Sequence, residues 1–115
     1  MRNIRLVVNN ELQKKEKEKF FIKKELQSIL NLYAKMVSNG SWKDYSFTSS
    51  VKEVSFDVYQ RASDKPVLRI LKNLKPKYFD ERYLIKDKNG IILKKSEDLN
   101  QLIKKTVWSK LRLVK

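Results

Sequence analysis

The 115-residue sequence contains no cysteine and no histidine, and only two glycines and two prolines. Without cysteine the chain has no disulfides, no thiolate metal site and no thiol nucleophile. Without histidine it lacks the commonest general base and the commonest zinc ligand. The two glycines, Gly40 and Gly90, are too few for a phosphate-cradling loop of the P-loop or dinucleotide-binding kind. We therefore expect a protein that is not an enzyme and that holds no metal or cofactor.

Long apolar runs are also missing. The first ten residues contain only the three-residue run 6–8 before the chain turns polar, whereas a signal peptide needs a longer apolar core. No stretch approaches the roughly 20 apolar residues of a membrane-spanning helix. These absences predict a cytoplasmic protein without a membrane span.

Positive charge is what the sequence has in excess. The formal net charge is +14, from 27 Lys and Arg against 13 Asp and Glu. Such a field attracts polyanions such as RNA, DNA or an anionic membrane surface. However, all but six of the basic residues are lysine, and an A+T-rich genome imposes a lysine-rich composition on tolerant surface positions. A functional polyanion site and a compositional origin of the charge both stay open.

The chain has the length of one domain, because two separate pieces would each be too small to bury a core. Residues 11–19 are almost wholly charged and form either a mobile arm or an extra turn before the first helix; we favour a frayed lead-in. We expect a flexible lead-in over residues 1–19 and a single domain over residues 20–115.

Apolar residues recur at spacings of three and four between residues 20 and 38, which predicts an amphipathic helix. Its apolar stripe consists of Ile22, Leu26, Ile29, Leu30, Tyr33, Met36 and Val37. The pair Asn39-Gly40 tolerates the left-handed conformation that ends many helices.

A second helix is predicted to begin at Ser96 as its N-cap, with Glu97 and Asp98 in the first turn. Its buried stripe consists of Leu99, Leu102, Ile103, Thr106 and Val107. Trp108 falls about half a turn off this stripe. Either the helix breaks there and residues 111–114 form a strand, or Trp108 is exposed for a partner; a second packing surface within the domain is the simpler interpretation.

Strand patterns lie between the two helices, at residues 42–47, 51–61, 67–71, 83–86 and 91–94. Asn89-Gly90 between the last two is a strong hairpin signal, because both residue types accept positive φ. The order predicts an α+β domain: an N-terminal helix, a four- to five-stranded antiparallel sheet and a C-terminal helix, with both helices on one sheet face.

Asp44 and Asp57 each lie inside a predicted strand, where aspartate is disfavoured. Pairing of residues 54–61 with 67–71 through a five-residue turn would place Tyr59 opposite Arg69 and Asp57 diagonal to it. The plain interpretation is an exposed Asp57–Arg69 ion pair, which contributes little stability.

The functional interpretation of the same strands is an anion-binding patch formed by Tyr59, Arg61 and Arg69. Arginine is informative in so lysine-rich a chain, because its planar fork binds carboxylates and phosphates through two parallel hydrogen bonds. The segment Trp42-Lys43-Asp44-Tyr45 adds aromatic rings beside a basic residue, as single-stranded nucleic-acid binders use. Such rings are equally common as core anchors at the edge of a sheet.

Several short segments together carry a family resemblance. They are Glu25-Leu26, Ile29-Leu30, Tyr33, Met36-Val37, Gly40, Trp42-Lys43-Asp44-Tyr45, Phe56-Asp57-Val58, Arg61-Ala62-Ser63, Pro66-Val67-Leu68-Arg69-Ile70, Tyr83, Gly90, Ile92-Leu93-Lys94 and Asp98-Leu99. Over roughly residues 20–112 the chain resembles the alphaproteobacterial domain-of-unknown-function family 2794. The resemblance implies a small cytoplasmic bacterial protein and brings no activity, ligand or catalytic residue. The candidate binding residues are Trp42, Lys43, Asp44, Tyr45, Tyr59, Arg61, Arg69 and Lys94.

Three functions remain in order of preference. The first is non-catalytic binding of nucleic acid or a ribonucleoprotein through a basic sheet face. The alternative is a protein-interaction or adaptor domain whose lysine excess is compositional, with Trp42, Tyr45 and Trp108 as anchors. The third is an enzyme with a carboxylate–arginine site for a phosphorylated substrate, which no residue pattern requires.

Overall fold

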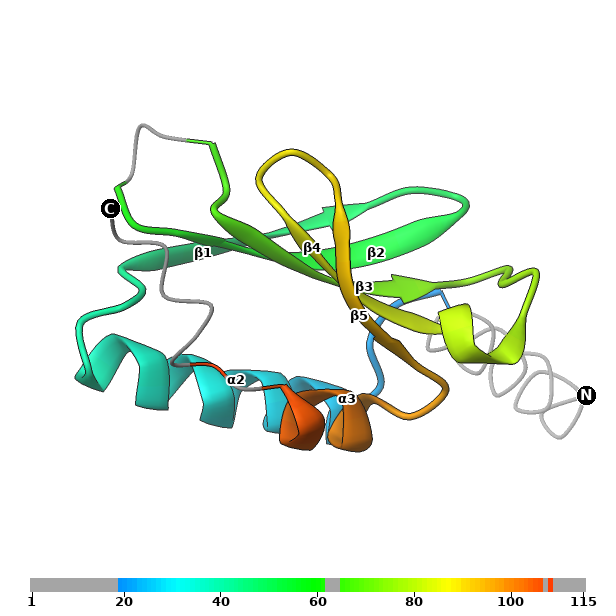
Figure 1. Cartoon of the computed structure of the whole chain (residues 1–115), viewed down its shortest axis with the longest axis horizontal. Coiled ribbons are helices and arrows are strands. Elements are labelled where there is room, and N and C mark those ends of the chain that lie inside the picture. The colour runs from blue at the N-terminus through cyan, green and yellow to red at the C-terminus, as the bar shows by residue number, and fades with distance from the viewer. Residues whose placement is uncertain (1–18, 62–64, 107, 109–115) are drawn as a thin grey trace, which may run out of the picture.

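The computed structural model describes residues 19–61, 65–106 and 108. In chain order these contain α2 (Lys23–Ser38), β1 (Asp44–Ser49), β2 (Glu53–Tyr59), β3 (Leu68–Asn73), the 3₁₀ turn η1 (Phe79–Glu81), β4 (Tyr83–Asp87), β5 (Ile92–Ser96) and α3 (Leu99–Lys105). The strands form one antiparallel sheet in the order β1-β2-β3-β4-β5, so each strand pairs with its neighbour in sequence. Both helices lie on the same side of this sheet (Figure 1). The predicted α+β architecture is confirmed, with five strands.

The core lies between the helices and the inner face of the sheet. Val54, Phe56 and Val58 alternate along β2 and are fully buried. Leu68 and Ile70 of β3 pair with Val58 and Phe56 and continue the same layer. Side chains of successive strand residues point to opposite faces, so the apolar half of the β2 pattern accounts for this layer.

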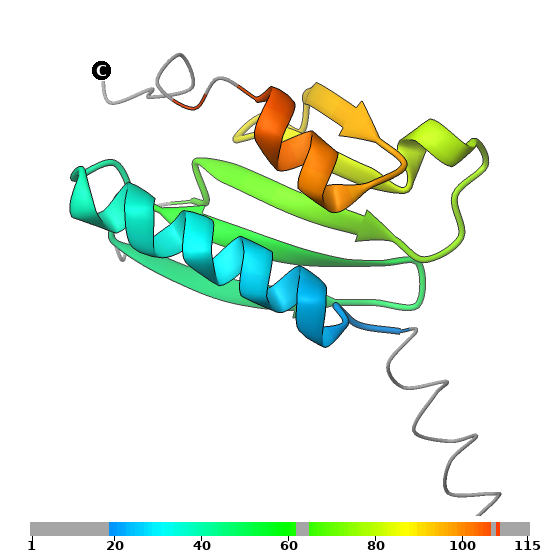
Figure 2. The same cartoon turned by 90° about the horizontal axis from the view of Figure 1, so that it is seen from below.

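α2 runs along the sheet beside α3, as Figure 2 shows. Its buried face contains Ile29, Leu32 and Met36, whereas Leu30 is 40% exposed and Val37 is 41% exposed. The predicted stripe was therefore partly wrong. Ile22, Leu30 and Val37 lie at the margin of the buried face of α2, and Leu32, which was not predicted, lies within it. Spacings of three and four residues occur along two adjacent rows of α2, and only packing against the sheet determines which row is buried.

A glycine ends α2 as predicted. Gly40 has φ +83°, its N–H donates to the Val37 carbonyl, and the N–H of Ser41 donates to the Met36 carbonyl at 2.9 Å. These two bonds form the Schellman arrangement that satisfies the last carbonyls of a helix.

The β4–β5 hairpin also forms where predicted, although only one residue of the Asn-Gly pair takes a positive φ. Gly90 has φ +81°, and no non-glycine residue in the described part of the chain has a positive φ. Asp87 closes the turn instead, since its Oδ1 accepts hydrogen bonds from the N–H groups of Asn89 and Ile91. A single left-handed glycine is what a turn with a following bulge requires.

The start of α3 differs from the prediction. Ser96 is not the N-cap, because it pairs with Tyr83 as the last residue of β5. Asp98 caps the helix, accepting a hydrogen bond from the N–H of Gln101 at 3.1 Å. Leu99 and Leu102 are buried as expected. Val107 and the possible strand at residues 111–114 lie outside the described residues.

Trp108 packs inside the domain. Its ring meets Trp42 edge to face at 5.8 Å, and its indole N–H donates to the Ile103 carbonyl at 3.0 Å. This favours the interpretation of Trp108 as a second packing surface. No helix among the described residues has the length and hydropathy needed to cross a membrane.

Candidate functional site

The sheet face that points away from α2 and α3 in Figure 1 is called here the open face. It carries a cluster of polar side chains from β1 and β2. Ser55, Asp57 and Tyr59 reach it from β2, in alternation with the core residues of that strand. Ser46 and Thr48 of β1 lie on the same face, because they pair with Asp57 and Ser55. β1 and β2 thus place three hydroxyl-bearing side chains and a tyrosine around one carboxylate.

Asp57 is the centre of this cluster and is only 1% exposed. Its Oδ2 accepts a hydrogen bond from the Thr48 hydroxyl at 2.6 Å, and its Oδ1 accepts one from the Ser55 hydroxyl at 2.7 Å. Hydrogen bonds to a charged acceptor are short and strong, which offsets the removal of this carboxylate from water. Both oxygens are therefore fixed in position.

Arg69 of β3 lies directly opposite Asp57, with its Nε 3.6 Å from Oδ1. The predicted register was wrong by two residues, since Tyr59 rather than Asp57 was placed opposite Arg69. A two-residue slip leaves every side chain on its face, which is why the ion pair was still found. The predicted five-residue turn is shorter than the connection in the structure, because β2 ends at Tyr59 and β3 begins at Leu68. Residues 62–64 of this connection lie outside the described residues.

The two residues of this ion pair differ in their exposure to solvent. The Arg69 side chain is 45% exposed, whereas Asp57 is buried. Across the next pairing, Lys86 of β4 lies opposite Arg69, so two cations are adjacent on the open face. Arg61, two residues beyond Tyr59, is exposed as well. Exposed lysines also occur on α2, on α3 and in the loops, so lysine density by itself singles out no surface.

The segment 42–45 divides between the two sides of the sheet. Trp42 is 5% exposed and belongs to the core, so its ring offers no surface to a partner. Tyr45 points to the helix side, where its ring meets Tyr33 edge to face at 4.9 Å, and it stays 40% exposed. Asp44 pairs with Tyr59 and turns its Oδ1 to the N–H of Tyr45, and Lys43 is exposed.

The remaining candidate, Lys94, lies on β5 at the opposite edge of the sheet from β1. The predicted site residues therefore do not form one cluster. The structure brings Tyr59 and Arg69 to the open face, with Asp44 beside Tyr59 and Arg61 at the end of β2. Trp42, Tyr45 and Lys94 lie elsewhere.

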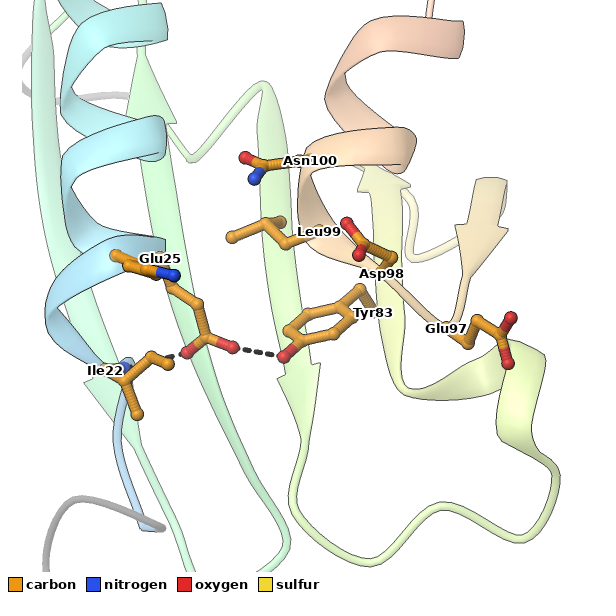
Figure 3. A pocket seen from close by; sticks show the side chains of 8 residues that line it. Ile22, Glu25, Tyr83, Glu97, Asp98, Leu99 and Asn100 are labelled. Carbon is orange, nitrogen blue, oxygen red and sulfur yellow. Dashed lines mark hydrogen bonds between the residues drawn. The ribbon is translucent and has the colours of Figure 1, made fainter.

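A second polar cluster, which we had not predicted, lies at the start of α2. Glu25 there is 8% exposed, Lys72 of β3 is 3% exposed and Tyr83 of β4 is 9% exposed. The Tyr83 hydroxyl donates to Glu25 Oε2, as Figure 3 shows. On the other oxygen of this carboxylate, Lys72 Nζ lies 2.9 Å from Glu25 Oε1. Beside them is a cavity of about 180 Å³, bordered also by Leu99 at the start of α3.

Each polar group of this Glu25–Lys72–Tyr83 cluster is used to hold the helix. Glu25 Oε1 also accepts from the N–H of Ile22, which has no side-chain acceptor of its own to cap α2. Lys72 Nζ donates further to the Phe20 carbonyl at 2.9 Å. Burial, together with the hydrogen bond to Glu25 and the charge of that residue, raises the pKa of Tyr83 to about 12. The cluster joins the start of α2 to β3 and β4.

Two signals in the sequence could have indicated this cluster. Lys72 continues the inward series of Leu68 and Ile70 in β3, and Glu25 stands one turn before Ile29 on the buried face of α2. A lysine and a glutamate on facing apolar surfaces predict a buried ion pair. The predicted strand 67–71 ended one residue before Lys72, so that residue was assigned to no face of the sheet.

The described residues contain no group of three or more His, Cys, Asp or Glu side chains that could hold a metal ion. What the open face presents is a hydroxyl-ringed carboxylate that positions an exposed arginine, with a lysine next to it. Such a group can bind an anion, and phosphate and carboxylate fit the arginine fork best.

The family described as "Protein of unknown function (DUF2794)" matches residues 19–103, which include both clusters. The chain belongs to the DUF2794 family. The resemblance found in the sequence is thereby confirmed, although the match ends before Trp108. No curated protein matches this DUF2794 domain. No solved structure matches it either.

Proposed function

We propose that this domain binds nucleic acid, or a ribonucleoprotein, through phosphate groups on the open face and without catalysis. The observation that supports this is the geometry of Arg69. Its Nε lies 3.6 Å from the buried Asp57, which orients the guanidinium while the side chain remains 45% exposed. Arginines that are positioned by a carboxylate lose less freedom when they bind, so the anion contact is stronger.

Lys86 adds a second cation next to Arg69, on the neighbouring strand. Adjacent strands lie about 4.8 Å apart. Two cations on neighbouring strands can contact phosphates of one nucleic-acid backbone, and such contacts provide affinity without reading the sequence. The hydroxyls of Ser46 and Tyr59, which share a 3.0 Å hydrogen bond, are further groups that can reach a phosphate or sugar.

The test is purification of the full chain from native lysate at low salt, with and without nuclease, followed by sequencing of any nucleic acid retained. We expect nucleic acid to co-purify and to be released as salt rises, since each neutralised phosphate steepens the salt dependence. Recovery of no nucleic acid at low salt would overturn the proposal. A cytoplasmic bacterial setting, implied by the family resemblance, stays part of this proposal.

A protein-interaction role is the second candidate, favoured by aromatic exposure on the edge strand β1. Tyr45 is 40% exposed and Phe47 is 37% exposed, and their rings lie 5.7 Å apart edge to face. Clustered aromatic side chains are typical anchors of protein interfaces. This role predicts a defined protein partner that remains bound after nuclease treatment and at moderate salt.

A further inference from the structure

The loop between β3 and β4 presents the most exposed large apolar side chain among the described residues. Phe79 in η1 is 85% exposed. Its neighbour Tyr78 is 59% exposed, but the ammonium group of Lys77 lies 5.8 Å from the Tyr78 ring. In the described part of the chain, the Phe79 ring has no such cation and no aromatic neighbour. A bare ring on a surface is available to a ligand.

The backbone that carries Phe79 is held at both ends. The N–H of Asn73 donates to the Arg82 carbonyl at 2.7 Å, which closes the base of the loop. Lys95 of β5 forms a 3.4 Å ion pair with Asp80, next to Phe79. Within η1 the N–H of Arg82 also donates to the Phe79 carbonyl. Because this backbone is already ordered, placing the ring against a ligand requires little further loss of conformational entropy.

Two hollows in the surface border the Phe79 ring. The larger, of about 770 Å³, is also lined by Lys94, Lys95 and Lys105. The smaller, of about 480 Å³, is also lined by Arg82. Lys105 Nζ is held by the Lys95 carbonyl at 2.6 Å, so its charge has a defined position in the larger hollow. An aromatic ring is thus flanked by four basic side chains.

We propose that Phe79 is a stacking platform for an unpaired base, and that the nucleic acid bound is single-stranded. The inference rests on the proposed function and names its ligand class. In a duplex the bases are already stacked on each other, whereas in a single strand each base can stack on a protein ring while lysines neutralise the adjacent phosphates. Lys94 and Lys105, which line the larger hollow with Phe79, would contact those phosphates.

Charge distinguishes this ligand from an anionic bilayer, which would also attract aromatic and basic side chains. Glu97 lines both hollows, and Asp80 and Asp98 line one each. These three carboxylates are exposed, so they oppose contact with an anionic lipid surface. A carboxylate beside a base, in contrast, can accept a hydrogen bond from an exocyclic amino group.

The test measures binding of the full chain to three fluorescent probes of about 12 nucleotides, a length within the site sizes of single-strand binding domains. The probes are a mixed-sequence single-stranded RNA, a strand of equal length without bases, and a duplex. Phe79→Ala should weaken binding of the single strand by roughly five- to 150-fold. Binding of the other two probes should not change, because the ring contacts only an unpaired base. Phe79→Trp should bind the single strand at least as tightly as the wild type.

The control is Val51→Ala, which truncates a 78% exposed apolar side chain in the β1–β2 hairpin. It should leave all three affinities unchanged. Unchanged binding of the single strand by Phe79→Ala, or an equal loss on all three probes, would overturn the stacking role and leave the proposed function standing. A wild-type chain that binds no probe at about 50 mM salt would overturn the proposed function itself. If Phe79→Ala keeps its binding of the three probes but no longer binds vesicles of anionic lipid, the ring contacts a membrane surface instead.

Discussion

Arg69 and Asp57 face each other across the β2–β3 pairing, one half-exposed and the other buried. Asp57 is held by two hydroxyls from its own strand and from β1, so three strands contribute to the position of one guanidinium. A carboxylate needed only for charge balance could remain in solvent. Its burial, at 1% exposure, and its two hydroxyl donors instead hold the carboxylate in one position beside Arg69.

We predict that Arg69→Lys weakens nucleic-acid binding although it keeps the charge. Lysine lacks the planar fork and would not be oriented by Asp57 through Nε. Arg69→Ala should in addition reduce the slope of log affinity against log salt by about one. Both are measured by fluorescence anisotropy over a series of salt concentrations. Lys52→Ala, at an exposed loop position, is the matched control and should change neither affinity nor slope appreciably.

Asp57→Asn tests the carboxylate itself. The substitution keeps the shape but removes the charge that holds Arg69, and the amide nitrogen cannot accept a hydrogen bond from a hydroxyl. We expect a loss of about 1–3 kcal/mol in the free energy of unfolding, measured with urea, together with weaker nucleic-acid binding. Asp44→Asn, at an exposed position, should leave stability nearly unchanged. Equal effects of the two substitutions would contradict the central role of Asp57.

The buried Glu25–Lys72 pair should respond differently to single and combined substitutions. Lys72→Met leaves the Glu25 carboxylate buried without its cation, and we expect a loss of about 3–5 kcal/mol of unfolding free energy. Replacement of the whole cluster, by Glu25→Leu, Lys72→Met and Tyr83→Phe together, should recover most of that loss, because no buried charge remains. Urea denaturation followed by circular dichroism measures both. A triple variant less stable than the single one would show that the cluster is favourable as a unit.

Tyr83 should make the domain less stable above pH 10. Its pKa in the folded state is raised from the ordinary 10.0 to about 12, so the folded chain retains a proton that the unfolded chain has lost. This contribution is fully present below pH 10 and is lost as the pH rises toward 12, by up to about 1.4 kcal/mol per pH unit. The difference in unfolding free energy between wild type and Tyr83→Phe should therefore shrink over that range. The two proteins differ only at this hydroxyl, so a constant difference would contradict its burial.

Local patterns accounted for the elements of this fold. Alternation at Val54, Phe56 and Val58 identified β2 and its buried face, and Gly40 and Gly90 marked a helix end and a hairpin. These features depend on residues within a few positions of each other. Ser96 was misplaced as the N-cap for the same reason, since Asp98 two residues later has an equally suitable side chain, and only pairing of Ser96 with Tyr83 separates them.

What the sequence alone determined is thus the order of helices and strands, the membership in the DUF2794 family and the faces of the central strands. Tertiary structure decided the register that sets Asp57 against Arg69, which row of α2 is buried, and the meeting of Glu25 with Lys72. Periodicity specifies a face because it is a local property. Which residues meet across two elements depends on loop length and on packing between distant segments, and neither follows from spacing within one segment.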